Sequence, residues 1–280
     1  MTFKKLFVFI LLAFLPMIGV GVAMPYVHAI VKYLLTAGAM FSPALAVIIT
    51  QVIYKEPVLK GVGISFKFNR WWVIGWLLIP VIAMAIVGVT LLMPGAKWTP
   101  DSDTIKLALQ AMPEGSDVWT IIGITMLSGL ISGVTVNAVF ALGEEIAWRG
   151  YLMNLFSGKA FWKTALITGS IWGLWHAPII FNGHNYPQHP VPGVFMMVVF
   201  CLLMTPILMY FRQKSGSVIV PAIMHATFNA VAGLSLMLVT PANDLLYGAT
   251  GLAGMIVLLI VNLCLFLYDR FVSKSDQLKM

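Results

Sequence analysis

Long apolar runs make up most of this chain, and short polar connections separate them. Within each run the apolar residues follow one another without the alternation of a membrane β-strand, so the runs predict helices. A helix needs about 20 mostly apolar residues to cross the hydrocarbon core of a bilayer. Runs of roughly that length lie near residues 6–25, 34–54, 71–93, 119–141, 164–181, 193–211, 217–239 and 248–268. The pattern predicts an all-α, polytopic membrane bundle of about eight transmembrane helices.

The connections between the runs show no soluble domain, internal repeat or low-complexity tract. We therefore expect a single integral membrane domain over residues 1–280. Between the third and fourth runs, the stretch Asp101–Met112 predicts a short helix at the membrane surface. The first run follows Lys4 and Lys5, as the apolar part of a signal peptide would, but its length and a poor cleavage site at residues 27–29 favour an uncleaved span.

Composition supports the membrane assignment, because 60% of the residues are hydrophobic and 10% are charged, with a mean hydropathy of +0.94. The net charge of +7 is also found in nucleic-acid-binding proteins, but here its distribution follows topology. With the N-terminus inside, Lys32, Lys97 and Lys106 fall on the outer side. The remaining 14 basic residues fall on the inner side: Lys4, Lys5, Lys55, Lys60, Lys67, Arg70, Arg149, Lys159, Lys163, Arg212, Lys214, Arg270, Lys274 and Lys279. This asymmetry predicts cytoplasmic N- and C-termini, attraction to anionic membrane lipid and no nucleic-acid partner.

Two adjacent carboxylates and an arginine interrupt the fourth apolar region, in the sequence Glu144-Glu145-Ile146-Ala147-Trp148-Arg149. Ionisable groups at membrane depth are functional candidates. On a helix, Glu145 and Arg149 are four residues apart with the acid first, which favours an ion pair. The alternative is a buried structural network that joins helices. That alternative leaves Glu144 unexplained, because Arg149 neutralises one carboxylate and not two.

His176 follows the aromatic sequence Trp172-Gly173-Leu174-Trp175. If the turn between the two helices centres near residue 160, Glu144 and His176 are each about 24 Å along their helices from it. Antiparallel helices would then place the two side chains at the same depth. His176 is either a hydrogen-bonded core histidine or, opposite a carboxylate, a general acid/base candidate.

His225 and Asn229 lie four residues apart in the seventh run, so a helix presents them on one face. Both side chains can donate hydrogen bonds, and together they could stabilise an oxyanion where water is scarce. The alternative is that they join helices as buried polar contacts.

These three motifs resemble those of the CAAX prenyl endopeptidases and bacteriocin-processing, or Abi, proteins, a family also called CPBP or intramembrane glutamic proteases. Its pattern is Glu-Glu-x-x-x-Arg, then Phe-x-x-x-His, then His-x-x-x-Asn, on an eight-helix membrane core. Here the matching segments, in the same order, are residues 144–149, 172–176 and 225–229. The resemblance covers residues 119–239, which we take as the core. Trp172 stands where the family usually has Phe, and since the aromatic ring is retained we expect His176 to keep its place.

The resemblance implies peptide hydrolysis without a metal, another cofactor or a covalent intermediate. By analogy, Glu144 is the general base, His176 helps to bind and activate the water, and His225 and Asn229 stabilise the oxyanion. The supporting residues, which would hold Glu144 in position, are Glu145 and Arg149. The implied substrate is a membrane-associated peptide or protein, in free or lipidated form, and the implied location is a bacterial plasma membrane.

Other functions remain to be weighed against this one. The chain lacks the His-Glu-x-x-His, Gly-x-Ser-Gly and Gly-x-Gly-Asp motifs of other proteases, although Glu144, His176 and His225 are a chemically possible zinc set. His184 and His189 look like exposed turn residues. A non-catalytic scaffold or immunity protein could use the same cluster for recognition. A transporter is less well supported, because broken helices and paired repeats are not evident.

Overall fold

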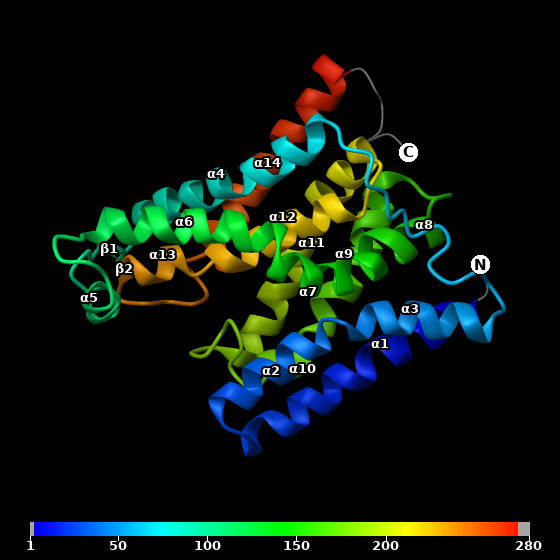
Figure 1. The fold of residues 1–280 in the computed structure, drawn as a ribbon, viewed down its shortest axis with the longest axis horizontal. Helices are drawn as coiled ribbons and strands as arrows, with labels where there is room; N and C mark the ends of the chain where they lie inside the picture. Colours follow the sequence, from blue (N-terminus) through cyan, green and yellow to red (C-terminus); the bar gives the residue numbers. More distant parts are fainter. Residues whose placement is uncertain (1–2, 274–280) are drawn as a thin grey trace.

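The computed structural model describes residues 3–273, and helices form most of it (Figure 1). Lys274, Lys279 and the C-terminus, which we predicted to be cytoplasmic, lie outside the described residues. The first half contains α1 (Phe3–Ala23), η1 (Met24–Tyr26), α2 (Ala29–Ala39), α3 (Ser42–Ile53), α4 (Arg70–Leu92), β1 (Lys97–Trp98), α5 (Asp103–Gln110) and α6 (Val118–Val134). The second half contains α7 (Val136–Glu145), η2 (Ile146–Leu152), α8 (Met153–Leu155), α9 (Phe161–Trp175), α10 (Ala177–Ile180), α11 (Pro190–Ser215), α12 (Ile219–Val231), α13 (Leu234–Met237), β2 (Val239–Thr240), α14 (Leu252–Tyr268) and η3 (Asp269–Ser273).

The predicted polytopic helical bundle is confirmed, with a difference in the number of spans. Within residues 3–273, six helices are long and apolar enough to cross a membrane. A seventh span arises if α6 and the helix over residues 136–155, which meet at a 57° bend, are counted as one. The expected span at 164–181 is helical, but α9 ends after 15 residues and the chain continues into α10. Each expected run is therefore helical, while helix breaks lower the number of full spans below eight.

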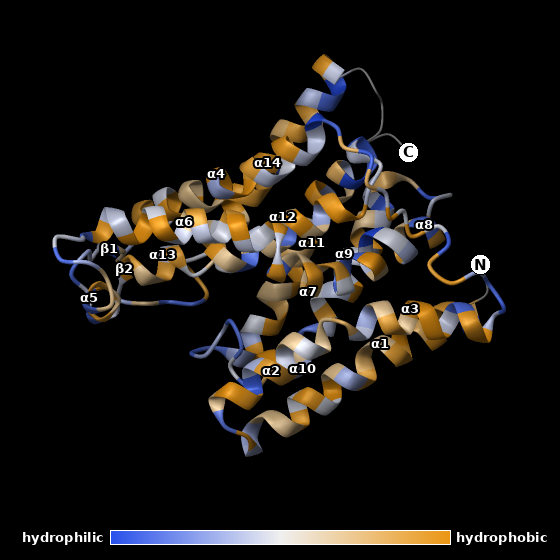
Figure 2. Cartoon of the chain, viewed as in Figure 1, coloured by the Kyte–Doolittle hydropathy of each residue, from blue (hydrophilic) through white to orange (hydrophobic). Residues whose placement is uncertain are grey.

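Helix α1 has one face buried against the protein and another exposed where lipid would contact it. Phe9, Ala13 and Met17 are buried on one side, at spacings of four that place them on one helix face. Leu11 and Leu15 are exposed on the other side, where an apolar side chain belongs against lipid. The hydropathy colouring in Figure 2 shows that the other long helices are also mainly apolar, and that polar residues are concentrated in the connections.

Two groups of helices lie on opposite sides of the molecule (Figure 1), and we call them the two arms. Helices α1, α2 and α3 lie in one arm, and α4, α6 and α14 lie in the other. Helices α9 and α11 pack together between the arms, and α12 packs against α4, α6, α7 and α11. The three motifs lie on α7, η2, α9 and α12, and the packing of α12 against α7 and of α9 against η2 brings these segments together.

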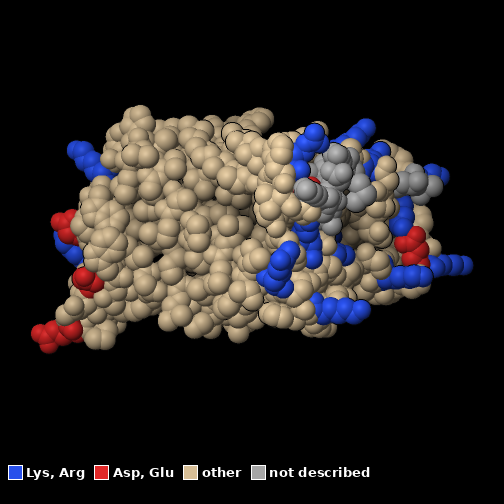
Figure 3. Space-filling view, turned by 90° about the horizontal axis from the view of Figure 1, so that it is seen from above, with Lys and Arg blue, Asp and Glu red and all other residues tan. Residues whose placement is uncertain are grey.

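The two ends of the bundle differ in charge. Figure 3 shows Lys and Arg gathered at one end, while the opposite end displays acidic groups with few basic ones. The predicted surface helix is present as α5 at the less basic end, with Ser102 capping its first turn. Strands β1 and β2 pair there as a short antiparallel ladder. Arg149 was counted with the inner basic residues, but it is buried within the bundle and makes no part of the charged surface.

Candidate active site

The helix that carries Glu144 changes its winding directly after the two carboxylates. Helix α7 ends at Glu145, and residues 146–152 continue as the π-helix η2, in which every residue is buried. Wider π turns are rare and occur frequently at functional sites. Gly143 permits close packing at this point, because a Cβ there would lie 2.6 Å from the carbonyl oxygen of Met40. This contact places the carboxylates beside the end of α2.

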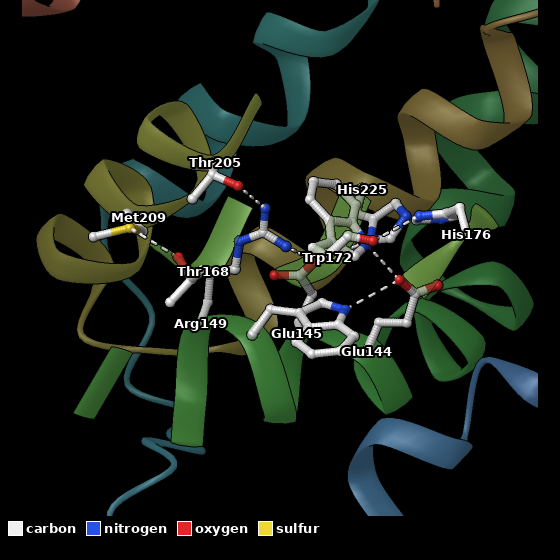
Figure 4. Close-up of polar contacts among 10 residues, drawn as sticks. Glu144, Glu145, Arg149, Thr168, Trp172, His176, Thr205, Met209 and His225 are labelled. Carbon is white, nitrogen blue, oxygen red and sulfur yellow. Dashed lines mark hydrogen bonds and ion pairs between the residues drawn. The ribbon is translucent and has the colours of Figure 1, made fainter. Parts of the chain in front are cut away.

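Glu145 accepts two hydrogen bonds from different elements. Arg149 Nη1 donates to its Oε1 at 2.8 Å, and His225 Nδ1 lies 2.9 Å from the same oxygen. Arg149 Nη2 also donates to Thr205 Oγ1 on α11, at 3.0 Å (Figure 4). The side chains of Glu145 and Arg149 have no exposed surface. These contacts join η2, α11 and α12 through charges that have no water to stabilise them.

That Glu145 and Arg149 hold Glu144 in position stays a prediction. The i,i+4 pair itself is present, but neither side chain hydrogen-bonds Glu144. Glu144 Oε2 instead accepts from two indoles: Trp172 Nε1 at 2.7 Å and Trp148 Nε1 at 3.2 Å. Among the described residues no donor contacts Glu144 Oε1. Glu145 Oε2 also has no hydrogen-bond partner within residues 3–273, but it is buried away from the cavity, whereas Glu144 lines the cavity.

Trp148 and the indole of Trp172 are site residues that sequence reasoning missed. The signal for Trp148 was its position four residues after Glu144, which brings the two side chains together on a helix. For Trp172 the signal was its departure from the family's Phe, since a phenyl ring has no N–H to donate. The guanidinium carbon of Arg149 lies 4.1 Å from the centre of the Trp172 ring, a cation–π geometry. His225 packs edge-on to the same ring, with centroids 5.3 Å apart.

His176 stands at the C-terminal end of α9 and is oriented by the backbone. Its Nδ1 lies 2.9 Å from the carbonyl oxygen of Trp172. A carbonyl oxygen accepts, so Nδ1 carries a proton, and in the neutral imidazole Nε2 is then an acceptor. Because the partner is a backbone atom, Trp in place of Phe leaves this contact intact, as expected from the sequence.

A cavity of about 460 Å³ brings the predicted catalytic residues together. Glu144, His176, His225 and Asn229 all contribute to its lining. Its apolar walls include methionine and aromatic side chains, among them Met197, Met204 and Phe200. This combination of an apolar wall and a few convergent polar groups is typical of small-molecule and peptide sites.

His184 and His189, which we expected in exposed turns, are both partly buried. His184 is half-buried and lines the cavity, and burial lowers the pKa of its imidazole below the ordinary value. It is therefore neutral at pH 7. His189 is partly exposed, and its Nδ1 lies 2.6 Å from Asp244 Oδ1. Within residues 3–273, no three His, Cys, Asp or Glu side chains are grouped as a metal site requires.

The part of the chain that is similar to a known protein family contains the site residues. Residues 126–231 match the sequence model of the type II CAAX prenyl endopeptidase Rce1-like family, and all three motifs lie within them. This segment of the chain is therefore similar to the CAAX prenyl endopeptidases. The CAAX prenyl protease 2 of Methanococcus maripaludis is 29% identical over 133 residues, which cover 45% of this chain and 46% of that relative. The chain thus spans about half the length of the curated relative it matches. The segments before residue 126, including α1 to α4, lie outside the residues that match the family model.

Replacing Arg149 by Met should lower the stability of the protein strongly. The substitution leaves Glu145 as a buried carboxylate with half of its neutralising partners removed, and breaking a buried pair costs about 3–5 kcal/mol. Thermal unfolding in detergent measures the loss. Arg70→Met is the control, because Arg70 is exposed at the start of α4. The double variant Arg149→Met with Glu145→Leu should regain part of the loss. Equal melting temperatures for Arg149→Met and Arg70→Met would contradict the network.

Proposed function

We propose that this protein is a metal-independent intramembrane endopeptidase of the glutamic type. The main support for the proposal is the pattern of hydrogen bonds to the Glu144 carboxylate in the cavity. Its Oε2 is held by two indoles, its Oε1 has no protein donor among the described residues, and His176 lines the same space. A carboxylate held in this way can accept a proton from a water molecule that His176 also binds.

The first chemical step joins water to the substrate carbonyl. Glu144 Oε1 takes one proton from the water, while the other water hydrogen points to His176 Nε2, the free acceptor of that ring. The water oxygen forms a bond to the carbonyl carbon of the scissile peptide. The carbonyl π electrons move to oxygen and give a tetrahedral oxyanion. Desolvation within the apolar cavity strengthens each of these polar contacts.

His225 and Asn229 stabilise the oxyanion. With Nδ1 directed at Glu145, His225 donates from Nε2 as an imidazolium whose charge Glu145 balances. Asn229 is exposed to the cavity one helical turn further along α12, and its amide supplies the second donor. When the intermediate collapses, the C–N bond breaks and Glu144 returns its proton to the leaving nitrogen. The products are a new carboxylic acid and a new amine, and transfer of the acid's proton to the amine gives a carboxylate and an ammonium group.

The substrate in this proposal is a peptide or protein segment associated with the membrane. The methionine and aromatic walls of the cavity fit an apolar or lipidated segment better than a highly charged one. The relative from Methanococcus maripaludis is named a prenyl protease, which is in line with such a segment. We also infer that the chain is one integral membrane domain and that both termini are cytoplasmic, on the distribution of Lys and Arg.

Glu144→Gln should abolish cleavage, because the amide keeps the shape of the side chain but cannot accept the proton of water. The measurement compares peptide termini in membranes of cells that make the wild-type or variant protein at matched levels. Glu114→Gln is the matched control, since Glu114 is exposed outside the spans. Termini that disappear with Glu144→Gln and with His176→Ala, and persist with Glu114→Gln, identify the substrate. Unchanged termini in all variants would leave a non-catalytic scaffold as the function.

Trp172→Phe should lower kcat and leave KM nearly unchanged. The substitution installs the residue usual in the family but removes the 2.7 Å indole donor to Glu144. A hydrogen bond to a charged group is worth about 1.5–3 kcal/mol, so kcat should fall by roughly 10- to 100-fold. Steady-state kinetics on the substrate found by terminus analysis provides the measurement. Trp162→Phe is the control on the same helix, where Trp162 is 41% exposed. Equal kcat values for wild type and Trp172→Phe would show that the indole does not position the base.

A further inference from the structure

The cavity extends from Glu144 in one direction along the bundle. On each helix that lines it, the lining residues stop at the level of the carboxylate. On α9 they begin at Trp172, on α12 they begin at His225, and on α11 they end at Met204. On the other side of this level, residues 147–152 of η2 are buried without lining the cavity. The site is therefore closed toward the end of the bundle where α8 meets α9.

The open direction is marked by exposed residues. Glu144 and His225 at the base are 2% and 5% exposed, whereas Tyr33 on α2 is 70% exposed. Lys32, Thr36 and Met40 line the cavity on one face of α2, at spacings of four. Met40 lies beside Gly143, so the mouth at Lys32 is about 12 Å along α2 from the level of the carboxylates.

The loops around the mouth form one connected surface. His184 and Asn185 line the cavity from the segment between α10 and α11, and Thr250 lines it from the segment before α14. These two segments are joined by the hydrogen bond from the Tyr186 hydroxyl to the Thr250 carbonyl oxygen, at 2.8 Å. The mouth thus belongs to the end of the bundle formed by the α1–α2, α10–α11 and β2–α14 connections.

The basic residues gather at the opposite end (Figure 3). Helix ends and connections at that end carry Lys4, Lys5, Lys55, Lys60, Lys67, Arg70, Lys159, Lys163, Arg212, Lys214 and Arg270. The mouth end carries Lys32, Lys97 and Lys106, together with the acidic residues Asp101, Asp103, Glu114, Asp117 and Asp244. In membrane proteins the side rich in Lys and Arg is cytoplasmic. The mouth therefore faces away from the cytoplasm.

We propose that the cavity admits peptide from the non-cytoplasmic face of the membrane. Its substrates are peptide segments of exported or membrane-anchored chains that are displayed on that face. The identity of the occupant as a substrate rests on the proposed protease function. The side on which the cavity opens rests on the lining residues and the charge distribution alone.

Thiol labelling of the full chain in intact cells tests the proposal. Cys201→Ala and Cys264→Ala first remove the native thiols, one buried in α11 and one exposed on α14. Thr36→Cys then reports the cavity and Asn185→Cys reports the loop at its mouth. Ser157→Cys reports the opposite end, where Ser157 is exposed between α8 and α9. The probe is a charged maleimide that does not cross membranes, applied before and after permeabilisation.

We expect Thr36→Cys and Asn185→Cys to be labelled equally before and after permeabilisation. Ser157→Cys should be labelled only after permeabilisation. Labelling of Ser157→Cys in intact cells, or loss of either mouth signal there, would overturn the proposal. The labelling series is repeated with Glu144→Gln, which should not change the pattern. A failure of the protease proposal would leave that pattern intact, whereas a reversed pattern would refute the access side without touching the catalytic assignment.

Discussion

The rest of the site depends on one constraint: a charged arginine inside a lipid-embedded bundle must find its partners within the protein. Arg149 meets this constraint through Glu145, Thr205 and the face of Trp172. Glu145 in turn contacts His225 on α12. Because a buried pair is costly to break, the network fixes the relative positions of η2, α9, α11 and α12. The positions of these helices in turn determine the shape of the cavity that their side chains line.

This network separates two carboxylates that are adjacent in the chain. Glu145 is paired through Oε1 with Arg149 and His225, whereas Glu144 lines the cavity and is oriented by neutral indole donors. Neutral donors orient a carboxylate without neutralising it, so its capacity to accept a proton is retained. The same network explains why His225 has one ring nitrogen committed and one directed toward the cavity. In our account, stability and chemistry are assigned to different members of one Glu-Glu pair.

Much of the fold could be predicted from hydrophobic runs, because lipid requires long apolar helices with internally satisfied backbones. The ion pair of Glu145 with Arg149 followed from helical spacing, as did the shared face of His225 and Asn229. The π-helix after Glu145 could not be predicted, since the residues suit an α-helix equally well. The break after His176 was also missed, although Pro178 offered a signal.

Contacts between distant segments were harder to predict than contacts within a helix. The sequence gives no spacing rule for the contact of Glu145 with His225, or of Trp172 with Glu144, because each depends on how separate helices pack. For that reason the contact of Glu145 with His225 was not predicted, and the indoles were left out of the site. The extent of the domain over residues 1–280 stays a prediction.

The most direct test of this division of labour is a comparison of melting temperatures and cleavage rates for purified Glu144→Gln and Glu145→Gln. Glu145→Gln should lower the melting temperature, because it leaves Arg149 without its carboxylate. Glu144→Gln should keep the wild-type melting temperature and lose cleavage. If both variants lower the melting temperature alike, or if Glu144→Gln still cleaves, the two carboxylates do not have separate roles and the account is wrong.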